Sequence, residues 1–237
     1  MIKAITSKDN SRVKFALSLK ENKYRKANKM FLAETFKSLE MALANHQVVE
    51  VFATEWLELP EEVQLNLVSE EILKKLSSNV SPEGVVFISK MNEYQGNYDK
   101  VLFLDHIQDP GNMGTLIRTA LAFSYDAVVV SKESVSIYNE KVINSTKGAI
   151  FAIPVFEEEL KNFKGSHQII VSTLSDKSIP LDEVKHDDKF VLVLGSESHG
   201  VSKETLKLSD IQVKIPIANI DSLNVAVAGG ILMNKIR

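Results

Sequence analysis

The sequence contains no cysteine among its 237 residues. Disulfide bonds, cysteine-ligated metal sites and thiolate nucleophiles are therefore excluded. No apolar run approaches the roughly 20 residues that span a bilayer, and the opening residues MIKAITSKDNSR lack the apolar core of a signal peptide. We therefore expect a cytoplasmic protein that does not enter a membrane.

Metal ligands and nucleotide-binding glycines are also scarce. The five histidines never occur at the spacing of a metal site, so we expect no metal, and we expect His106 and His199 to be ordinary loop residues. No G-x-G-x-x-G motif follows a predicted strand, which argues against a nicotinamide-dependent dehydrogenase.

Positive charge is concentrated near the N-terminus. Residues 1–37 contain ten Lys or Arg and three Asp or Glu, a net charge of +7, whereas the remaining 200 residues carry −10. A basic segment of this kind attracts a polyanion by releasing counterions, although an isolated basic run is also typical of a solvated helix face. The candidate contacts to a nucleic acid are Arg12, Lys14, Lys23, Arg25 and Lys26.

Hydrophobic patterns predict two α/β domains, residues 1–92 and 100–237, joined by the polar stretch between them. The first is expected to have helices at 11–29, 35–46 and 61–78 and strands at 30–34, 48–54 and 84–90. The second is expected to have strands at 101–107, 127–131, 151–156, 168–173, 190–195 and 211–216, and helices at 112–124, 139–147, 157–163, 202–208 and 222–236. These strands are short, continuous apolar runs, which are typical of a parallel sheet covered on both faces.

Three loops that follow predicted strands carry the candidate chemistry, because open α/β sheets bind ligands at the carboxyl ends of their strands. The first is LDHIQDPGNMGTLIRTALAF (104–123). Its Asp-Pro-Gly turn leads to Asn112, which we expect to cap the next helix. Arg118 and the helix-end amides predict an anion site, or more simply a capped helix with one exposed arginine.

The second and third loops are ambiguous when each is considered alone. VLVLGSESHG (191–200) brings Glu197 to the edge of the sheet, as an acceptor for ribose or base groups or as a cap for the next helix. In IPIANIDSLNVAVAGG (215–230), Ser222 is the expected N-cap of the last helix. We expect the pair Gly229-Gly230 to permit close packing and not to bind phosphate.

In this order and spacing the three segments resemble the motifs of the SpoU/TrmH group of the SPOUT superfamily. These proteins are RNA ribose 2′-O-methyltransferases that use S-adenosylmethionine. The resemblance covers about residues 101–234, including STKGAIFAIPV (145–155), and extends more loosely to SRVKFALSLKENKYRKANKMFLAET near the N-terminus. It implies an α/β SPOUT-type parallel sheet with a C-terminal trefoil knot, an exception to the rule that chains are unknotted. It also implies a preceding small, ribosomal-protein-like α/β domain and a homodimer.

The resemblance assigns roles to particular residues. The catalytic set that it implies is Asn112, Arg118, Glu197, Ser222 and Asn224. The cofactor, held largely by main-chain groups, is expected at Thr173, Leu194, Gly195, Ile215, Ile217 and Leu223. A guanidinium remains protonated, so we expect Arg118 to hold an RNA phosphate and the developing alkoxide and not to act as a simple base.

The chain departs from the family pattern at three positions. Ser124 and Thr35 occupy places where the family usually has glycine, and Asn234 replaces an expected tyrosine. None of these departures removes a catalytic candidate. Ribosomal RNA is the expected substrate; a tRNA methyltransferase and an RNA-binding protein without catalysis are the alternatives.

Overall fold

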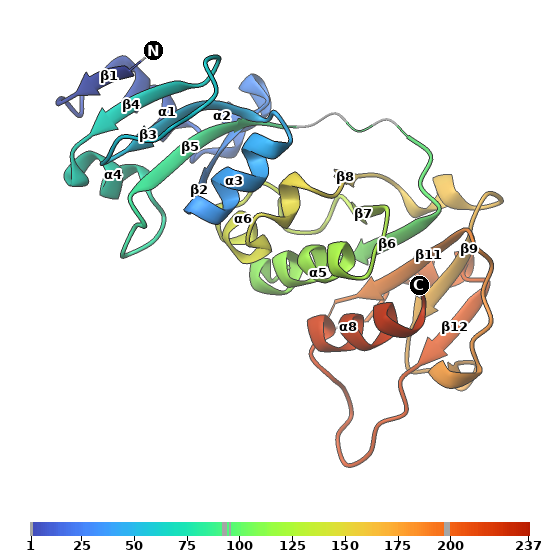
Figure 1. The fold of residues 1–237 in the computed structure, drawn as a ribbon. Coiled ribbons are helices and arrows are strands. Elements are labelled where there is room, and N and C mark those ends of the chain that lie inside the picture. The colour runs from blue at the N-terminus through green and yellow to red at the C-terminus, as the bar shows by residue number, and fades with distance from the viewer. Residues whose placement is uncertain (1, 92–93, 95, 197–199) are drawn as a thin grey trace. The chain divides into compact units, whose positions relative to one another are not determined.

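The computed structural model describes residues 2–91, 94, 96–196 and 200–237 (Figure 1). It divides into two compact units, the first comprising Met1–Glu93 with Tyr138–Ala152 and the second comprising Tyr94–Ile137 with Ile153–Arg237. The segment Tyr138–Ala152 lies in the middle of the expected second domain in sequence, yet it packs with the first unit. In the described part of the chain, no helix has the length and apolar character needed to cross a bilayer.

The first unit is built on a five-stranded mixed sheet. Its elements are β1 (Ile2–Ile5), α1 (Ser11–Ser18), α2 (Asn22–Asn28), β2 (Met30–Glu34), α3 (Phe36–Ala44), β3 (Val48–Ala53), β4 (Gln64–Val68), α4 (Glu70–Leu76), β5 (Val85–Lys90), α6 (Glu140–Thr146) and the 3₁₀ helix η1 (Ala149–Phe151). The strand order is β1-β4-β3-β5-β2. Strand β5 runs antiparallel to both of its neighbours, and the other pairs are parallel.

Aromatic and polar contacts attach the segment Tyr138–Ala152 to this sheet. The Phe31 ring lies 4.8 Å from the Tyr138 ring and 5.8 Å from the Phe151 ring, measured between centroids. On α6, Asn144 Nδ2 donates a hydrogen bond of 3.0 Å to the buried carboxylate of Glu34. The segment is therefore part of the hydrophobic core of the first unit.

The structure corrects two helices that were expected in this unit. Residues 61–78 form strand β4 and then helix α4, because QLNLV alternates across a sheet and pairs with both β1 and β3. Residues 11–29 form two helices with a break at Lys20-Glu21. The Arg25 guanidinium donates hydrogen bonds to the carbonyls of Leu19 and Lys20 and so stabilises that break.

The second unit is a seven-stranded parallel sheet in the order β10-β12-β9-β11-β6-β7-β8. Its elements are β6 (Lys100–Asp105), α5 (Pro110–Ala122), β7 (Ala127–Val130), β8 (Val155–Glu157), η2 (Leu160–Phe163), β9 (Gln168–Ser172), β10 (Ile179–Pro180), η3 (Leu181–Glu183), β11 (Phe190–Gly195), α7 (Lys203–Leu208), β12 (Ile211–Lys214) and α8 (Val225–Lys235). Pro154 falls within the expected strand 151–156, which is instead the end of η1, a turn and the start of β8.

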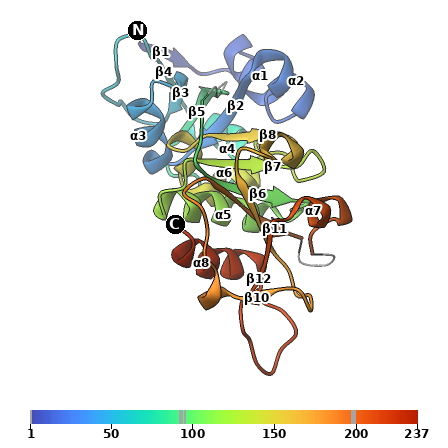
Figure 2. The ribbon, with the colours of Figure 1, turned by 90° about the vertical axis from the view of Figure 1, so that its right-hand side faces the viewer.

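Helices cover both faces of this sheet, as the apolar strands predicted. Helices α5 and α8 lie side by side in both views and pack on one face (Figures 1 and 2). Helices α7 and η2 cover the opposite face, where they contact a cluster that includes Val101, Phe103 and Val191. After β11 the chain passes beyond β9 to form β12 and returns so that α8 packs against β11 and α5. The expected trefoil knot requires such a return path.

Candidate functional site

A cavity of about 340 Å³ opens at the carboxyl edge of the parallel sheet in the second unit. Its size falls within the usual range of small-molecule sites. All six residues expected to hold a cofactor line it, together with Ser222. Residues from three parts of the chain that are far apart in sequence thus line one cavity: 172–174, 194–196 with Gly200, and 214–228.

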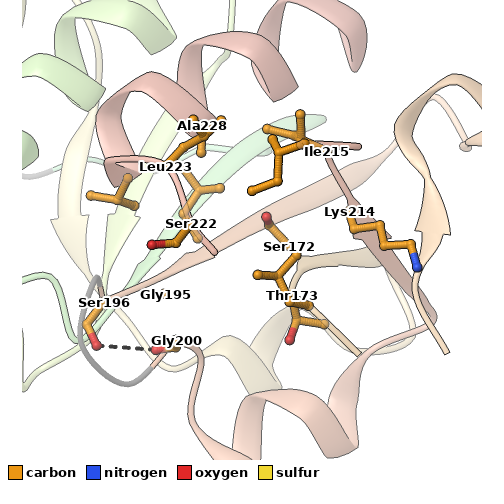
Figure 3. Close-up of a pocket in the computed structure, with 14 residues that line it drawn as sticks. Ser172, Thr173, Gly195, Ser196, Gly200, Lys214, Ile215, Ser222, Leu223 and Ala228 are labelled. Atoms are coloured by element: carbon orange, nitrogen blue, oxygen red, sulfur yellow. Dashed lines mark hydrogen bonds between the residues drawn. The ribbon is translucent and has the colours of Figure 1, made fainter. Parts of the chain in front are cut away.

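The lining is mostly apolar side chains and backbone, with few charges. Leu223 and Ala228 lie on one side of the cavity, and Ser172 and Thr173 lie on the other (Figure 3). Among the described lining residues only Lys214 is charged, and its ammonium group extends away from the others (Figure 3). The described lining therefore points no cationic group into the cavity, which suits a positively charged ligand such as a sulfonium.

Gly195 is required by a close approach of two backbone segments. A Cβ at this position would lie 2.3 Å from the carbonyl carbon of Gly200 and 2.3 Å from the nitrogen of Val201. Ser196 N–H donates to Gly200 O at 3.0 Å, and Gly200 N–H donates to Ser196 O at 2.9 Å. Ser196 and Gly200 thus pair with each other in the lining of the cavity.

The first and third loops meet at two asparagines. Asn224 is the N-cap of α8, because its Oδ1 accepts hydrogen bonds from Ala226 N–H at 2.9 Å and Val227 N–H at 3.3 Å. Its Nδ2 then donates to Asn112 Oδ1 at 3.1 Å. The two backbone donors also settle the orientation of the Asn224 amide, since only its nitrogen remains to face Asn112.

Both expected helix caps are shifted, by three residues toward the N-terminus at α5 and by two residues toward the C-terminus at α8. Helix α8 is capped by Asn224 and not by Ser222, which instead lines the cavity. Helix α5 is capped by Asp109, whose Oδ1 accepts from Asn112 N–H at 2.7 Å, and Pro110 occupies its first turn. Asn112 therefore lies inside the first turn of α5, and its side chain is available to Asn224.

Gly229 brings helix α8 close to α5 and the sheet. A Cβ at this position would lie 2.4 Å from Leu116 Cδ2 and 2.9 Å from Leu194 Cδ1. A Cβ at Gly230 would meet nothing closer than Thr119 Cγ2 at 4.0 Å. The packing interpretation therefore holds for Gly229, whereas nothing in the packing requires a glycine at position 230.

Among the described catalytic candidates, Ser222 lines the cavity, whereas Asn112, Arg118 and Asn224 do not. Arg118 is exposed on α5, and its guanidinium forms no hydrogen bond or ion pair with the residues that the structure describes. Glu197 lies outside the described residues, as does His199. His106 follows β6, with Nδ1 2.7 Å from Asp105 Oδ1. In the described ranges, no cluster of three His, Asp or Glu side chains is arranged to hold a metal ion.

The basic candidates of the first unit differ in exposure. Arg25 is only 6% exposed and binds carbonyls of its own chain, and Arg12 Nη1 lies 2.6 Å from Oε1 of the buried Glu50. The side chains of Lys14 and Lys23 are exposed, at 2.9 Å from Asp9 and 3.3 Å from Glu21, and Lys26 is exposed as well. Arg25 is thus engaged within the protein, Arg12 is paired with Glu50 but stays partly exposed, and the three lysines are at the surface.

Sequence reasoning missed several residues that line the cavity. These are Ser172, Leu174, Ser196, Gly200, Lys214, Val225 and Ala228. Most of them directly precede or follow a residue that was expected there. Their position at the ends of the same strands could have identified them.

Comparisons with known proteins agree with this geometry. Residues 99–234 match the SpoU rRNA Methylase family, and residues 10–86 match the MRM3-like substrate binding domain. The chain is 31% identical to the 23S rRNA (guanosine(2553)-2′-O)-methyltransferase RlmP of Bacillus subtilis (strain 168), with all of both chains covered.

Solved structures give the same result. An AdoMet-bound rRNA methyltransferase from Sinorhizobium meliloti is similar with a TM-score of 0.88 and 25% identity, over 99% of this chain and 97% of that one. An RNA 2′-O ribose methyltransferase is similar with a TM-score of 0.80 and 28% identity, over 98% and 97%. The chain therefore belongs to the SpoU rRNA methylase family and is an S-adenosylmethionine-dependent RNA 2′-O-ribose methyltransferase.

Proposed function

We propose that this enzyme methylates ribosomal RNA, and that the cavity between β9, β11 and the loop before α8 holds the methyl donor. The observation that carries the proposal is the convergence of the expected cofactor residues on one cavity, with Ser222 in its lining and Asn224 at the start of the adjoining helix. S-adenosylmethionine supplies a methyl group activated by its sulfonium. The remaining chemistry belongs to the protein, which must align a weakly nucleophilic hydroxyl with that methyl group.

The asparagine pair and Ser222 orient the ribose hydroxyl. Alignment of two reactants in the correct geometry contributes roughly 7–11 kcal/mol in favourable cases. Because Asn224 also caps α8, its side chain has a defined direction before the RNA binds. Arg118, which is exposed and protonated, holds the phosphate beside the target ribose and stabilises the developing alkoxide. Glu197 completes the site by hydrogen bonding.

The substrate assignment is supported by relatives that this chain matches over their full length. RlmP is named for a guanosine of 23S rRNA, and the equivalent guanosine is the first position to inspect. The first unit binds the RNA, with exposed Lys14, Lys23 and Lys26 contributing charge and the two arginines supporting the fold. A ribosomal substrate places the enzyme in the cytoplasm.

The enzyme acts as a homodimer through the second unit. Helix α8 exposes Val227 at 53% and Ile231 at 40%, and the loop before it exposes Ile220 at 56%. Apolar side chains grouped on one helix face are typical of an interface. Light scattering after gel filtration checks this assignment, and a monomer at micromolar concentration would contradict it.

Ribose-methylation mapping of total RNA, with and without the gene, tests the function. We expect one 2′-O-methyl mark in 23S rRNA to disappear and to return with the wild-type protein. Arg118→Ala should bind S-adenosylmethionine as the wild type does but fail to restore the mark. A lost mark in tRNA would overturn the substrate assignment. Absence of binding heat with S-adenosylmethionine would favour an RNA-binding protein without catalysis.

A further inference from the structure

Asp105 is a buried carboxylate that the proposed chemistry does not use. It is the last residue of β6 and is 2% exposed. A carboxylate is costly to bury unless hydrogen bonds replace the water that it loses. The partners of Asp105 therefore indicate what the residue does.

Those partners connect two of the three loops at the site. Ser202 N–H donates to Asp105 Oδ2 at 2.7 Å, and His106 Nδ1 lies 2.7 Å from Asp105 Oδ1. Ser202 lies two residues after Gly200, which is hydrogen-bonded to Ser196, and it begins α7 as its N-cap. Asp105 itself begins the loop that leads to Asn112.

The register of the sheet places this carboxylate beside the cofactor loop. Strands β6 and β11 pair in parallel with Asp105 opposite Gly195, so the two strands end next to each other at the same edge of the sheet. Gly195, Ser196 and Gly200 line the cavity, whereas Ser202 and Asp105 do not. A side chain outside the cavity thus holds the outgoing end of the loop that forms its wall.

We propose that Asp105 is a positioning residue, which holds the backbone of Gly200–Ser202 against Gly195 and Ser196 and so keeps these residues in the arrangement that binds the methyl donor. The inference rests on the proposed use of this cavity for S-adenosylmethionine. Without Asp105, Ser202 N–H would lose a buried acceptor, and the backbone at Ser196 and Gly200 would lose its support.

The test compares three variants by calorimetry with S-adenosylmethionine. Asp105→Leu has the same number of side-chain heavy atoms but accepts no hydrogen bond, and we expect its Kd to rise about tenfold. Asp105→Asn can still accept from Ser202 N–H and donate to His106 Nδ1, so its Kd should stay within about threefold of the wild-type value. Ser134→Ala is the control, because Ser134 bonds to Leu104 O and Ile107 N–H at the same end of β6 but not to the cofactor loop.

Steady-state kinetics separate positioning from general destabilisation. Asp105→Leu should raise the KM for S-adenosylmethionine more than the KM for RNA. Hydrogen exchange on the wild type gives a measurement that needs no variant: the Ser202 amide should be protected and should exchange more slowly when the donor is bound.

Wild-type affinity in Asp105→Leu, equal weakening in Ser134→Ala, or an unprotected Ser202 amide in the donor complex would each overturn the proposal. If the wild type binds no S-adenosylmethionine, the use of the cavity fails as well. If the wild type binds S-adenosylmethionine and Asp105→Leu binds it equally well, the role of Asp105 is refuted but the use of the cavity is not.

Discussion

Asn224 donates a hydrogen bond of 3.1 Å to Asn112 across 112 residues of sequence. The same amide of Asn224 caps α8 through its oxygen. One side chain thus stabilises a helix and fixes the position of a second polar group at the proposed reaction centre. These two roles can be separated by substitution.

Asn224→Ser should keep the helix cap and lose the contact with Asn112. A serine side chain is too short to reach Asn112 Oδ1 while its hydroxyl accepts from the first amides of α8. Serine and asparagine cap helices about equally well, so the free energy of unfolding should change by less than about 0.5 kcal/mol. The methyl-transfer kcat should fall by about 100-fold, the loss expected when a reacting group is misaligned. Urea denaturation and single-turnover methylation measure the two effects, and an unchanged kcat would exclude the asparagine pair from the mechanism.

Gly229→Ala and Gly230→Ala should change stability in opposite directions. At Gly229 the new methyl group overlaps Leu116 and Leu194, and such overpacking costs about 1–3 kcal/mol. At Gly230 the methyl group has room, and the higher helix propensity of alanine should stabilise the protein by about 0.5–1 kcal/mol. Thermal unfolding of the two variants is the measurement, and the same sign for both would contradict the packing described for α8.

Ser124→Gly should stabilise the protein. Ser124 has a φ of +59° and follows the C-cap of α5, where Tyr125 N–H bonds to Ala120 O and Ser124 N–H bonds to Leu121 O. This is the Schellman arrangement, and glycine is the residue that adopts it without strain. We expect a gain of about 1 kcal/mol in the free energy of unfolding. Ser124→Ala, which keeps the Cβ, is the matched control and should give no such gain.

Thr35→Gly tests the second position where the family usually has glycine. Thr35 adopts φ +82° and ψ +142°, a region that is strained for residues with a Cβ by about 1–3 kcal/mol. Its hydroxyl also accepts a hydrogen bond from Ser38 N–H as the N-cap of α3. Replacing such a cap by glycine lowers the free energy of unfolding by roughly a few tenths of a kcal/mol. The relief of strain should exceed the lost cap, so the melting temperature should rise. A fall would show that the cap contributes more.

Glu34→Gln tests the buried network that holds α6. Burial raises the pKa of Glu34, but hydrogen bonds from Ser77, Ser78 and Asn144 outweigh it and hold that pKa below its ordinary value of 4.5. The charged form is thus favoured in the folded state, and its contribution to stability is present above about pH 4.5 and lost as the pH falls through the lower folded pKa. The stability difference between wild type and Glu34→Gln should shrink in acid. A difference that does not change between pH 7 and pH 3 would contradict this.

Much of the second unit could be predicted from local sequence. Its central strands are continuous apolar runs that can only be buried, and the Asp-Pro-Gly turn marks the start of α5. The motifs predicted six cofactor-binding residues, and all six line one cavity, although their contact with the cofactor stays a prediction. Strand β4 was missed because QLNLV stands between residues that favour helix, and only pairing with β1 and β3 makes it a strand.

What the sequence by itself determined is most of the local conformations, with exceptions such as β4, and the residue types that binding and methyl transfer need. Tertiary structure decided which distant groups meet. The bond between Asn112 and Asn224, the burial of Arg25, the packing of Tyr138–Ala152 with the first unit and the support of Ser202 by Asp105 all depend on it. The physical reason is that these contacts join segments from about six to more than a hundred residues apart, and the favourable free energy appears only when the sheet brings them together.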